Sequence, residues 1–222
     1  MIDRGRVELF LREHLRYGVL LAELLLGRKS PIFLDYPINP VPRYGYGKPP
    51  HKRLYELINE KSEIYKYCLT DFVGERNAFS KISRYKQSDS DLEPYIDNDF
   101  FPLLDAFVQY SLLNLNDPKR YFEIGSGEST KFARRAIRDF GLRTKITSID
   151  PFPRSRIDEL CDVLVRKPVE GIDLEIFQSL EEGDILFVDS SHRVFQNSDV
   201  TVCFLDIIPY LKPGVLVHFH DI

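Results

Sequence analysis

Apolar residues recur at different spacings in the two halves of the chain. In the first half they recur every three to four positions over residues 7–26, 54–72 and 104–115, which predicts three amphipathic helices. Between the first two, residues 30–51 hold six prolines alternating with aromatic residues, a composition that resists helix and sheet alike. We expect an extended Pro/Tyr-rich loop there, and an end of the third helix at Asn116-Asp117-Pro118.

After Pro118, short apolar runs alternate with helical stretches. The runs span residues 121–124, 145–149, 162–165, 184–188 and 215–219. Five strands joined by four helical crossovers predict an α/β fold, a Rossmann-like doubly wound parallel sheet with helices on both faces. We therefore divide the chain into an N-terminal helical extension, residues 1–97, and a Rossmann-like domain, residues 98–222. In such a sheet, ligands bind beyond the carboxyl ends of the strands.

Composition narrows the class of protein. The 222 residues are 43% hydrophobic and 29% charged, as is ordinary for a globular protein, and the net charge of −4 argues against nucleic acid as a partner. The apolar run over residues 18–26 contains Glu23 and is too short to span a bilayer. Three widely spaced cysteines fit neither a disulfide framework nor a zinc site, so we expect a cytoplasmic protein.

A glycine turn follows the first predicted strand, in Tyr121-Phe-Glu-Ile-Gly-Ser-Gly-Glu-Ser-Thr130. Gly125 and Gly127 permit a tight turn and a close backbone approach, and Ser129 or Thr130 can cap a helix from Lys131 to Phe140. Such a turn exposes backbone N–H groups to a ligand.

Acidic residues flank this turn. Glu123 ends an otherwise apolar strand, where a buried carboxylate needs a partner, such as a cationic or hydrogen-donating ligand. Glu128 stands where a pyrophosphate would need room, and the third glycine of a dinucleotide motif is missing. Both features disfavour a nicotinamide-dependent oxidoreductase.

Asp150 closes the second predicted strand, 25 positions after Gly125. A carboxylate there can accept hydrogen bonds from both hydroxyls of a ribose. It can equally cap the next turn, because Pro151 follows it and Arg154 is a possible ion-pair partner. The residues alone leave both interpretations open.

Four motifs in this order resemble a class I S-adenosylmethionine-dependent methyltransferase, over roughly residues 98–222. They are the glycine turn with Glu123, Ser148-Ile-Asp-Pro151, Gly183-Asp-Ile-Leu-Phe-Val-Asp-Ser-Ser-His192 and Leu211-Lys-Pro-Gly-Val-Leu-Val-His-Phe-His-Asp-Ile222. The last two resemble the subgroup with F-V-D-x-S-H after strand four and H-D after strand five. The resemblance implies the strand order 3-2-1-4-5.

The resemblance also implies the cofactor, S-adenosylmethionine. Glu128 is then tolerable, because a sulfonium ligand brings no phosphate. Asp150 would hold the ribose, and the glycine turn would face the methionine part. The implied cofactor-binding residues are Glu123, Gly125, Ser126, Gly127, Ser129, Asp150 and Asp189.

The catalytic residues implied by the resemblance are His192, Asp189, His220 and Asp221. A carboxylate beside an imidazole can fix its tautomer and raise its basicity, so His192 is the candidate general base for O-methyl transfer to a small-molecule or sugar hydroxyl. In the structural alternative, His192 caps the following loop and Asp221 binds backbone N–H groups. Asp189 and Asp221 could also bind Mg²⁺, but a third ligand is not identifiable.

Other expectations concern the whole chain. The family normally continues past the fifth strand with a helix and two more strands, so we expect a C-terminally incomplete version of a longer enzyme, with the fifth strand at an open sheet edge. Tyr44, Tyr46, Phe100 and Phe101 could line an acceptor site. A homo-oligomer is compatible with the sequence, and a non-catalytic interaction module is the alternative function.

Overall fold

The computed structural model describes residues 17–26, 35–37, 39, 41–45, 47–87 and 92–221, which form two compact units, Met1–Glu60 and Lys61–Ile222. In the first unit, residues 17–25 are helical and α2 spans Lys52–Asn59, while residues 7–16 of the first predicted helix lie outside the described part. The described residues of the Pro/Tyr-rich loop form turns and an isolated bridge between Gly45 and Lys48. No described helix is long and apolar enough to cross a membrane.

The second unit begins with three helices: α3 (Ser62–Val73), α4 (Arg76–Phe79) and α5 (Leu103–Asn116). The single helix predicted over residues 54–72 is broken at Glu60-Lys61. Phe72 on its predicted apolar face is buried, whereas other residues of that face, such as Leu54 and Ile58, are exposed. Phe79 of α4 packs in the same core as the sheet. Residues 61–87 and 92–97 thus belong to the compact unit that contains the sheet, while the proposed start of a cofactor-binding domain at residue 98 stays a prediction.

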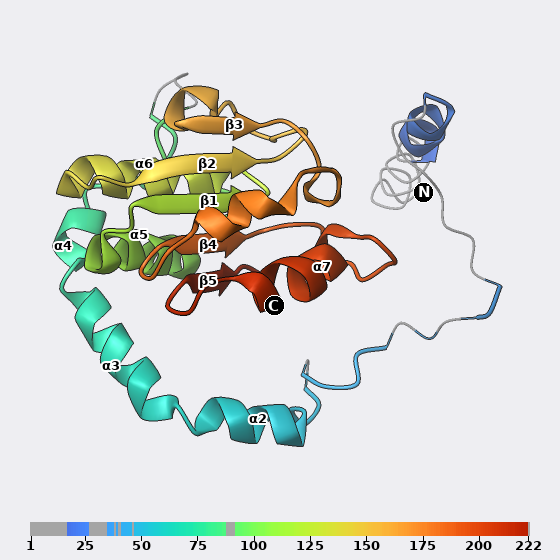
Figure 1. Ribbon diagram of the computed structural model, residues 1–222, viewed down its shortest axis with the longest axis horizontal. Coiled ribbons are helices and arrows are strands. Elements are labelled where there is room, and N and C mark those ends of the chain that lie inside the picture. The colour runs from blue at the N-terminus through green and yellow to red at the C-terminus, as the bar shows by residue number, and fades with distance from the viewer. Residues whose placement is uncertain are drawn as a thin grey trace, which may run out of the picture. The chain divides into compact units, whose positions relative to one another are not determined.

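The sheet has the predicted topology. Strands β1 (Arg120–Ile124), β2 (Lys145–Ile149), β3 (Val163–Val165), β4 (Ile185–Val188) and β5 (Leu216–Phe219) pair in parallel in the order β3-β2-β1-β4-β5. Figure 1 shows the five arrows pointing the same way, with β3 and β5 at the two edges. The Rossmann-like fold and the order 3-2-1-4-5 are confirmed.

The crossovers depart from the prediction. α6 (Glu128–Phe140) joins β1 to β2 and starts three residues earlier than expected. The helices predicted between β2 and β3 and between β3 and β4 are wrong, because those segments hold only the short 3-10 turns η1 (Asp158–Leu160), η2 (Val169–Gly171) and η3 (Leu174–Ser179). Pro151, Pro153 and Pro168 interrupt them, since proline lacks the N–H that a helix interior needs.

The crossover from β4 to β5 is helical but irregular. It consists of α7 (Asp199–Val202), the π-helical turn η4 (Cys203–Ile207) and the 3-10 turn η5 (Ile208–Tyr210). Ser198 caps α7, because its side chain accepts a hydrogen bond from the Thr201 N–H. The helical part of this crossover therefore begins directly after Ser198.

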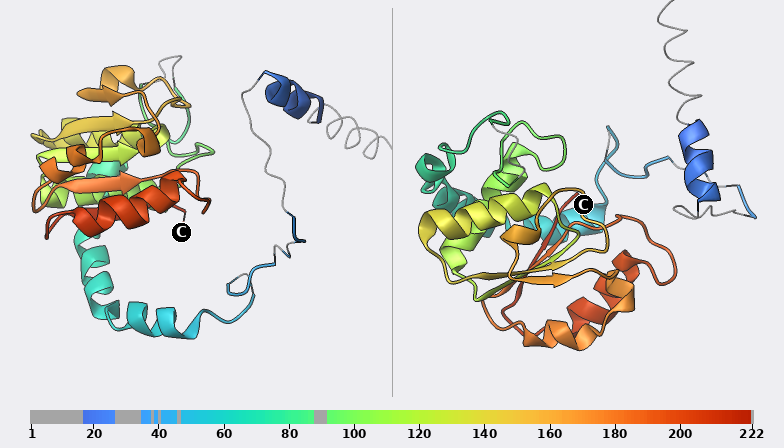
Figure 2. Two further views of the ribbon diagram at one scale, coloured as in Figure 1. Left: turned by 45° about the vertical axis from the view of Figure 1, so that its right-hand side comes forward. Right: turned by 90° about the horizontal axis from the view of Figure 1, so that it is seen from above.

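Each face of the sheet has its own apolar core. Because successive side chains of a strand alternate between faces, Ile185 and Phe187 of β4 join one cluster and Leu186 and Val188 the other. The first cluster packs α5 and α6 on the sheet, and the second packs η3, α7 and η4, as Figure 2 shows in its right-hand view. Burial on both faces explains why the strands read as continuous apolar runs.

The strands end in register at their carboxyl edge. Ile124 of β1 pairs with Ile149 of β2 and Val188 of β4, and Val188 pairs with Phe219 of β5. The ladder continues one residue further, since the N–H groups of Gly125, Asp150, Asp189 and His220 each donate to a carbonyl of a neighbouring strand. The residues that follow the four strands are therefore brought side by side.

Candidate active site

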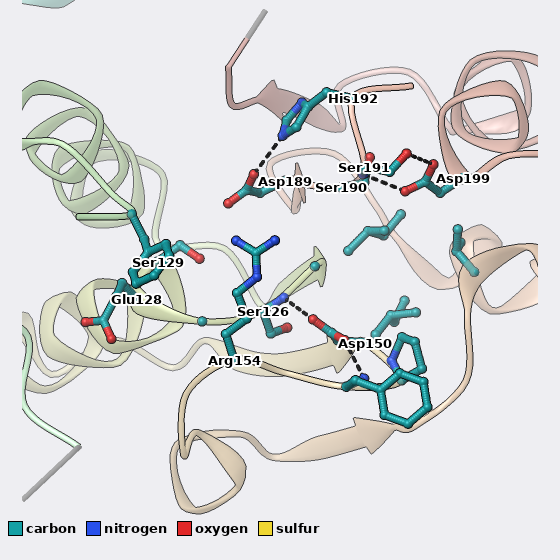
Figure 3. A pocket seen from close by; sticks show the side chains of 18 of the residues that line it. Ser126, Glu128, Ser129, Asp150, Arg154, Asp189, Ser190, Ser191, His192 and Asp199 are labelled. Atoms are coloured by element: carbon teal, nitrogen blue, oxygen red, sulfur yellow. Dashed lines mark hydrogen bonds and ion pairs between the residues drawn. The ribbon is translucent and has the colours of Figure 1, made fainter. Parts of the chain in front are cut away.

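A cavity of about 570 Å³ opens at this carboxyl edge (Figure 3). Its walls come from the turns after β1, β2 and β4, the residues after β3 and β5, and the segment before α5. Its volume lies within the range of small-molecule sites. The polar lining residues are Asp99, Ser126, Glu128, Ser129, Asp150, Arg154, Ser155, Glu170, Asp189, Ser190, Ser191, His192, Asp199 and Asp221.

The two glycines of the turn have different tasks. Gly125 has a φ of +80°, and a Cβ there would lie 1.7 Å from the backbone oxygen of Asp189. Only glycine lets the β1 turn approach the β4 turn this closely. Gly127 lines the cavity and has no heavy atom within 4 Å of where its Cβ would stand. It therefore leaves open space beside the helix start, where a ligand can approach the backbone.

Glu123 lies beneath the turn rather than in it. Its carboxylate is fully buried and accepts hydrogen bonds from the hydroxyls of Ser129 and Thr130, both at 2.5 Å. Burial raises the pKa of Glu123 to about 7, partly opposed by those two hydroxyls. The partner that the sequence demands for Glu123 is thus supplied by the first turn of α6, and Thr130 also accepts from the Gly127 N–H at 3.1 Å.

Asp150 organises the turns around the cavity. One carboxylate oxygen accepts from the Ser126 N–H at 2.9 Å and the other from the Phe152 N–H at 2.7 Å. No hydrogen bond or ion pair joins Asp150 to Arg154 within the described residues, so the ion pair considered as one alternative is absent there. Asp150 also lines the cavity, where free lone pairs of its carboxylate can accept further hydrogen bonds.

Glu128 would repel a phosphate group less strongly than the sequence alone indicates. Its carboxylate forms a buried ion pair with Lys131 at 2.7 Å and accepts from Ser155 Oγ at 2.8 Å. Lys131 largely neutralises the charge that was expected to repel a phosphate. The missing third glycine, rather than Glu128, is therefore the feature that disfavours binding of a dinucleotide.

On the opposite wall, Asp189 lies between two histidines. Its Oδ1 is 3.2 Å from His192 Nε2 and 3.3 Å from His220 Nδ1. His192 faces the cavity, whereas His220 is buried against Phe101 with a ring separation of 5.0 Å, outside the lining. The Asp189 carboxylate raises the pKa of His220, although the contact lacks the geometry of a hydrogen bond and neither ring nitrogen of His220 has a hydrogen-bond partner among the described residues.

The loop after β4 is held in a strained conformation. His192 has a φ of 58°, and Asp221 after β5 has a φ of 55°, in the left-handed region that non-glycine residues rarely adopt. Asp199 holds this loop, because its carboxylate accepts from the backbone N–H of Ser191 at 2.7 Å and from its hydroxyl at 2.6 Å. Such strain persists only where surrounding contacts over-determine it, as they commonly do at functional sites.

The structure brings most of the predicted site residues to one cavity. Gly125, Ser126, Gly127, Ser129, Asp150, Asp189, His192 and Asp221 line it, while Glu123 and His220 support it from below. Sequence reasoning missed the lining residues Asp99 and Glu170 and the loop-holding role of Asp199. No local signal marks them, because each reaches the cavity through the tertiary fold.

Two further expectations can be placed on the structure. Phe100 and Phe101 do line the cavity, while Tyr46 lies outside the described residues and Tyr44 belongs to the first compact unit. Within the described residues, no three His, Cys, Asp or Glu side chains are grouped so that they could hold a metal ion. Asp189 and Asp221 thus lack a third ligand in this arrangement.

Comparison with known proteins finds a family model that resembles the C-terminal part of the chain. Residues 122–222 match a family model described as a methyltransferase domain. In this segment and in the order of its sheet, the chain is similar to the class I S-adenosylmethionine-dependent methyltransferases. The family implies S-adenosylmethionine as cofactor, and the narrower F-V-D-x-S-H subgroup stays a prediction.

An uncharacterized protein of Archaeoglobus fulgidus is 32% identical to the chain over 97 residues. The match covers 41% of this chain and 44% of that protein, so the chain spans less than half the length of the relative. No solved structure matches the chain significantly.

The buried carboxyl of Glu123 makes stability depend on pH. Its folded-state pKa of about 7 lies above the ordinary 4.5, so its contribution is most favourable below about pH 4.5 and is lost as pH rises through about 7. We expect Glu123→Gln, which cannot ionise, to gain about 2–3 kcal/mol of unfolding free energy relative to the unmodified protein between pH 5 and pH 8. Urea unfolding at both pH values measures this, with the exposed Glu175→Gln as control. A Glu123→Gln curve that parallels the unmodified protein would contradict the assignment.

Proposed function

We propose that the protein transfers a methyl group from S-adenosylmethionine to a hydroxyl of a small molecule or sugar, with His192 as general base. The observation that carries the proposal is the pairing of His192 with Asp189 across one cavity from the glycine turn and Asp150. One wall offers backbone and a carboxylate to a nucleoside-like ligand. The other offers a base oriented by a carboxylate.

The cavity fits the cofactor that the family implies. When bound, S-adenosylmethionine supplies a methyl group activated by a sulfonium. The open space at Gly127 admits a ligand against the backbone, and the Asp150 carboxylate faces the same cavity. Carboxylates dominate the lining, which suits a ligand with an ammonium and a sulfonium. Asp150 would accept hydrogen bonds from the ribose hydroxyls while keeping its bonds to the Ser126 and Phe152 N–H groups.

Proton transfer would run through the His192 ring. In the tautomer whose Nε2–H group donates a hydrogen bond to Asp189 Oδ1, Nδ1 is unprotonated and can accept a proton. Nδ1 would take the proton of the acceptor hydroxyl, and Asp189 would stabilise the imidazolium that forms. His220 would act as a positioning residue, because it contacts Asp189 from below and does not reach the cavity.

The first test separates cofactor classes. We expect calorimetric titration to show binding of S-adenosylmethionine and no comparable binding of NAD. Asp150→Ala should weaken S-adenosylmethionine about 10- to 100-fold, because charge-assisted bonds to a ribose contribute roughly 1.5–3 kcal/mol. The exposed substitution Asp173→Ala, at the 3-10 turn η3, serves as control. Preferential binding of NAD would indicate an oxidoreductase, and binding of neither by the folded protein would indicate a non-catalytic module.

The second test addresses the base. We expect a screen of hydroxylated metabolites and sugars to yield an acceptor whose methylation releases S-adenosylhomocysteine. His192→Gln should then lower kcat by about 10²- to 10⁴-fold while the affinity for S-adenosylmethionine changes less than about twofold. Arg193→Gln, at the next position and outside the cavity lining, is the matched control. Unchanged kcat in His192→Gln would remove His192 as the base.

A further inference from the structure

Acidic side chains far outnumber basic ones in the lining of the cavity. Among its described lining residues, seven carboxylates face a single Lys or Arg side chain, Arg154. The carboxylates are Asp99, Glu128, Asp150, Glu170, Asp189, Asp199 and Asp221. Glu128 is paired with Lys131, but the other six carboxylates would repel an anionic group of a ligand, and Arg154 is the lining residue whose cation could bind such a group.

Arg154 points into the cavity without a protein acceptor. Figure 3 shows its guanidinium extending from the loop after β2 toward the middle of the cavity. Its contact is with the ring of Phe100, 5.8 Å from the guanidinium carbon to the ring centroid, and no ion pair or hydrogen bond of Arg154 occurs among the described residues. By contrast, Arg156, two positions on, pairs with Glu159 at 3.7 Å and lies outside the lining.

Three of the lining carboxylates already have partners. Glu128 is bound to Lys131, the Asp150 oxygens accept from two backbone N–H groups, and Asp189 lies between the histidines. The exposed Arg154 guanidinium therefore keeps five N–H donors and a planar edge that matches a carboxylate in bidentate geometry. The Phe100 ring lies on one side of the guanidinium and leaves those donors available.

We propose that Arg154 binds the α-carboxylate of the cofactor's amino-acid part. This inference rests on the proposed function and adds to it a residue that selects for the carboxylate itself. A ligand whose ammonium and sulfonium suit the acidic walls still has one negative group to place, and burying that group near seven carboxylates without a cation would be costly. Arg154 extends into the cavity from the loop that follows Asp150.

Two ligands that differ only in this group provide the test. S-adenosylmethionine and decarboxylated S-adenosylmethionine are titrated into the unmodified protein, Arg154→Gln, Arg154→Lys and Arg156→Gln. We expect Arg154→Gln to weaken S-adenosylmethionine about 10-fold or more and to change the decarboxylated ligand less than about threefold. Arg154→Lys should recover part of the loss, because lysine keeps the charge but not the bidentate geometry. Arg156→Gln should change neither.

The outcomes distinguish this inference from the proposed function. Retained binding of the decarboxylated ligand by Arg154→Gln shows that the cavity is folded, so a selective loss for S-adenosylmethionine supports the assignment. Equal effects of Arg154→Gln on both ligands, or no effect on either, would overturn it while leaving the cofactor site in place. Failure of the unmodified protein to bind either ligand would overturn the proposed function and this inference with it.

Discussion

The contact between the Gly125 backbone and the carbonyl of Asp189 is the constraint on which the site depends. Parallel strands in register deliver their following residues to one edge, but a turn after β1 can reach the turn after β4 only if nothing projects from Gly125. That approach sets the glycine turn and the Asp189–His192 pair on facing walls of one cavity. A side chain at Gly125 would push the turn after β1 away from the turn after β4, and the two walls of the cavity would no longer face each other at this distance.

The site also contains several carboxylates in or beneath the cavity, and each has a different environment. Burial raises the pKa of Glu123 to about 7, although the hydrogen bonds from two hydroxyls oppose that rise, whereas Glu128 is paired with Lys131. Asp189 shares its charge with two histidines, and it raises the pKa of His220. The carboxylates in and beneath the cavity therefore differ in their partners. Arg154 differs from them as a cation whose N–H donors bind no described residue.

Much of this could be predicted because sheet topology follows from local patterns. The strand runs, the glycine turn and the acidic residues that follow β2, β4 and β5 are local signals, and the strand register then brings those residues to one edge. The short crossovers could not be read from apolar spacing, because Pro151 and Pro168 interrupt runs that otherwise resemble helices. The hydrogen bonds between Ser129 and Glu123 and between Ser191 and Asp199 could not be predicted either, because only the folded turns bring these residues together. The acceptor leaves no local signature.

The central claim is that the carboxyl-edge cavity binds S-adenosylmethionine between the glycine turn and the Asp189–His192 pair. A crystal structure of the protein with S-adenosylhomocysteine tests it most directly. The account predicts both ribose hydroxyls within hydrogen-bond distance of the Asp150 carboxylate, and the amino-acid part along Gly125–Ser129. Ligand bound outside this cavity, or an adenosine that leaves Asp150 without a ribose contact, would contradict it.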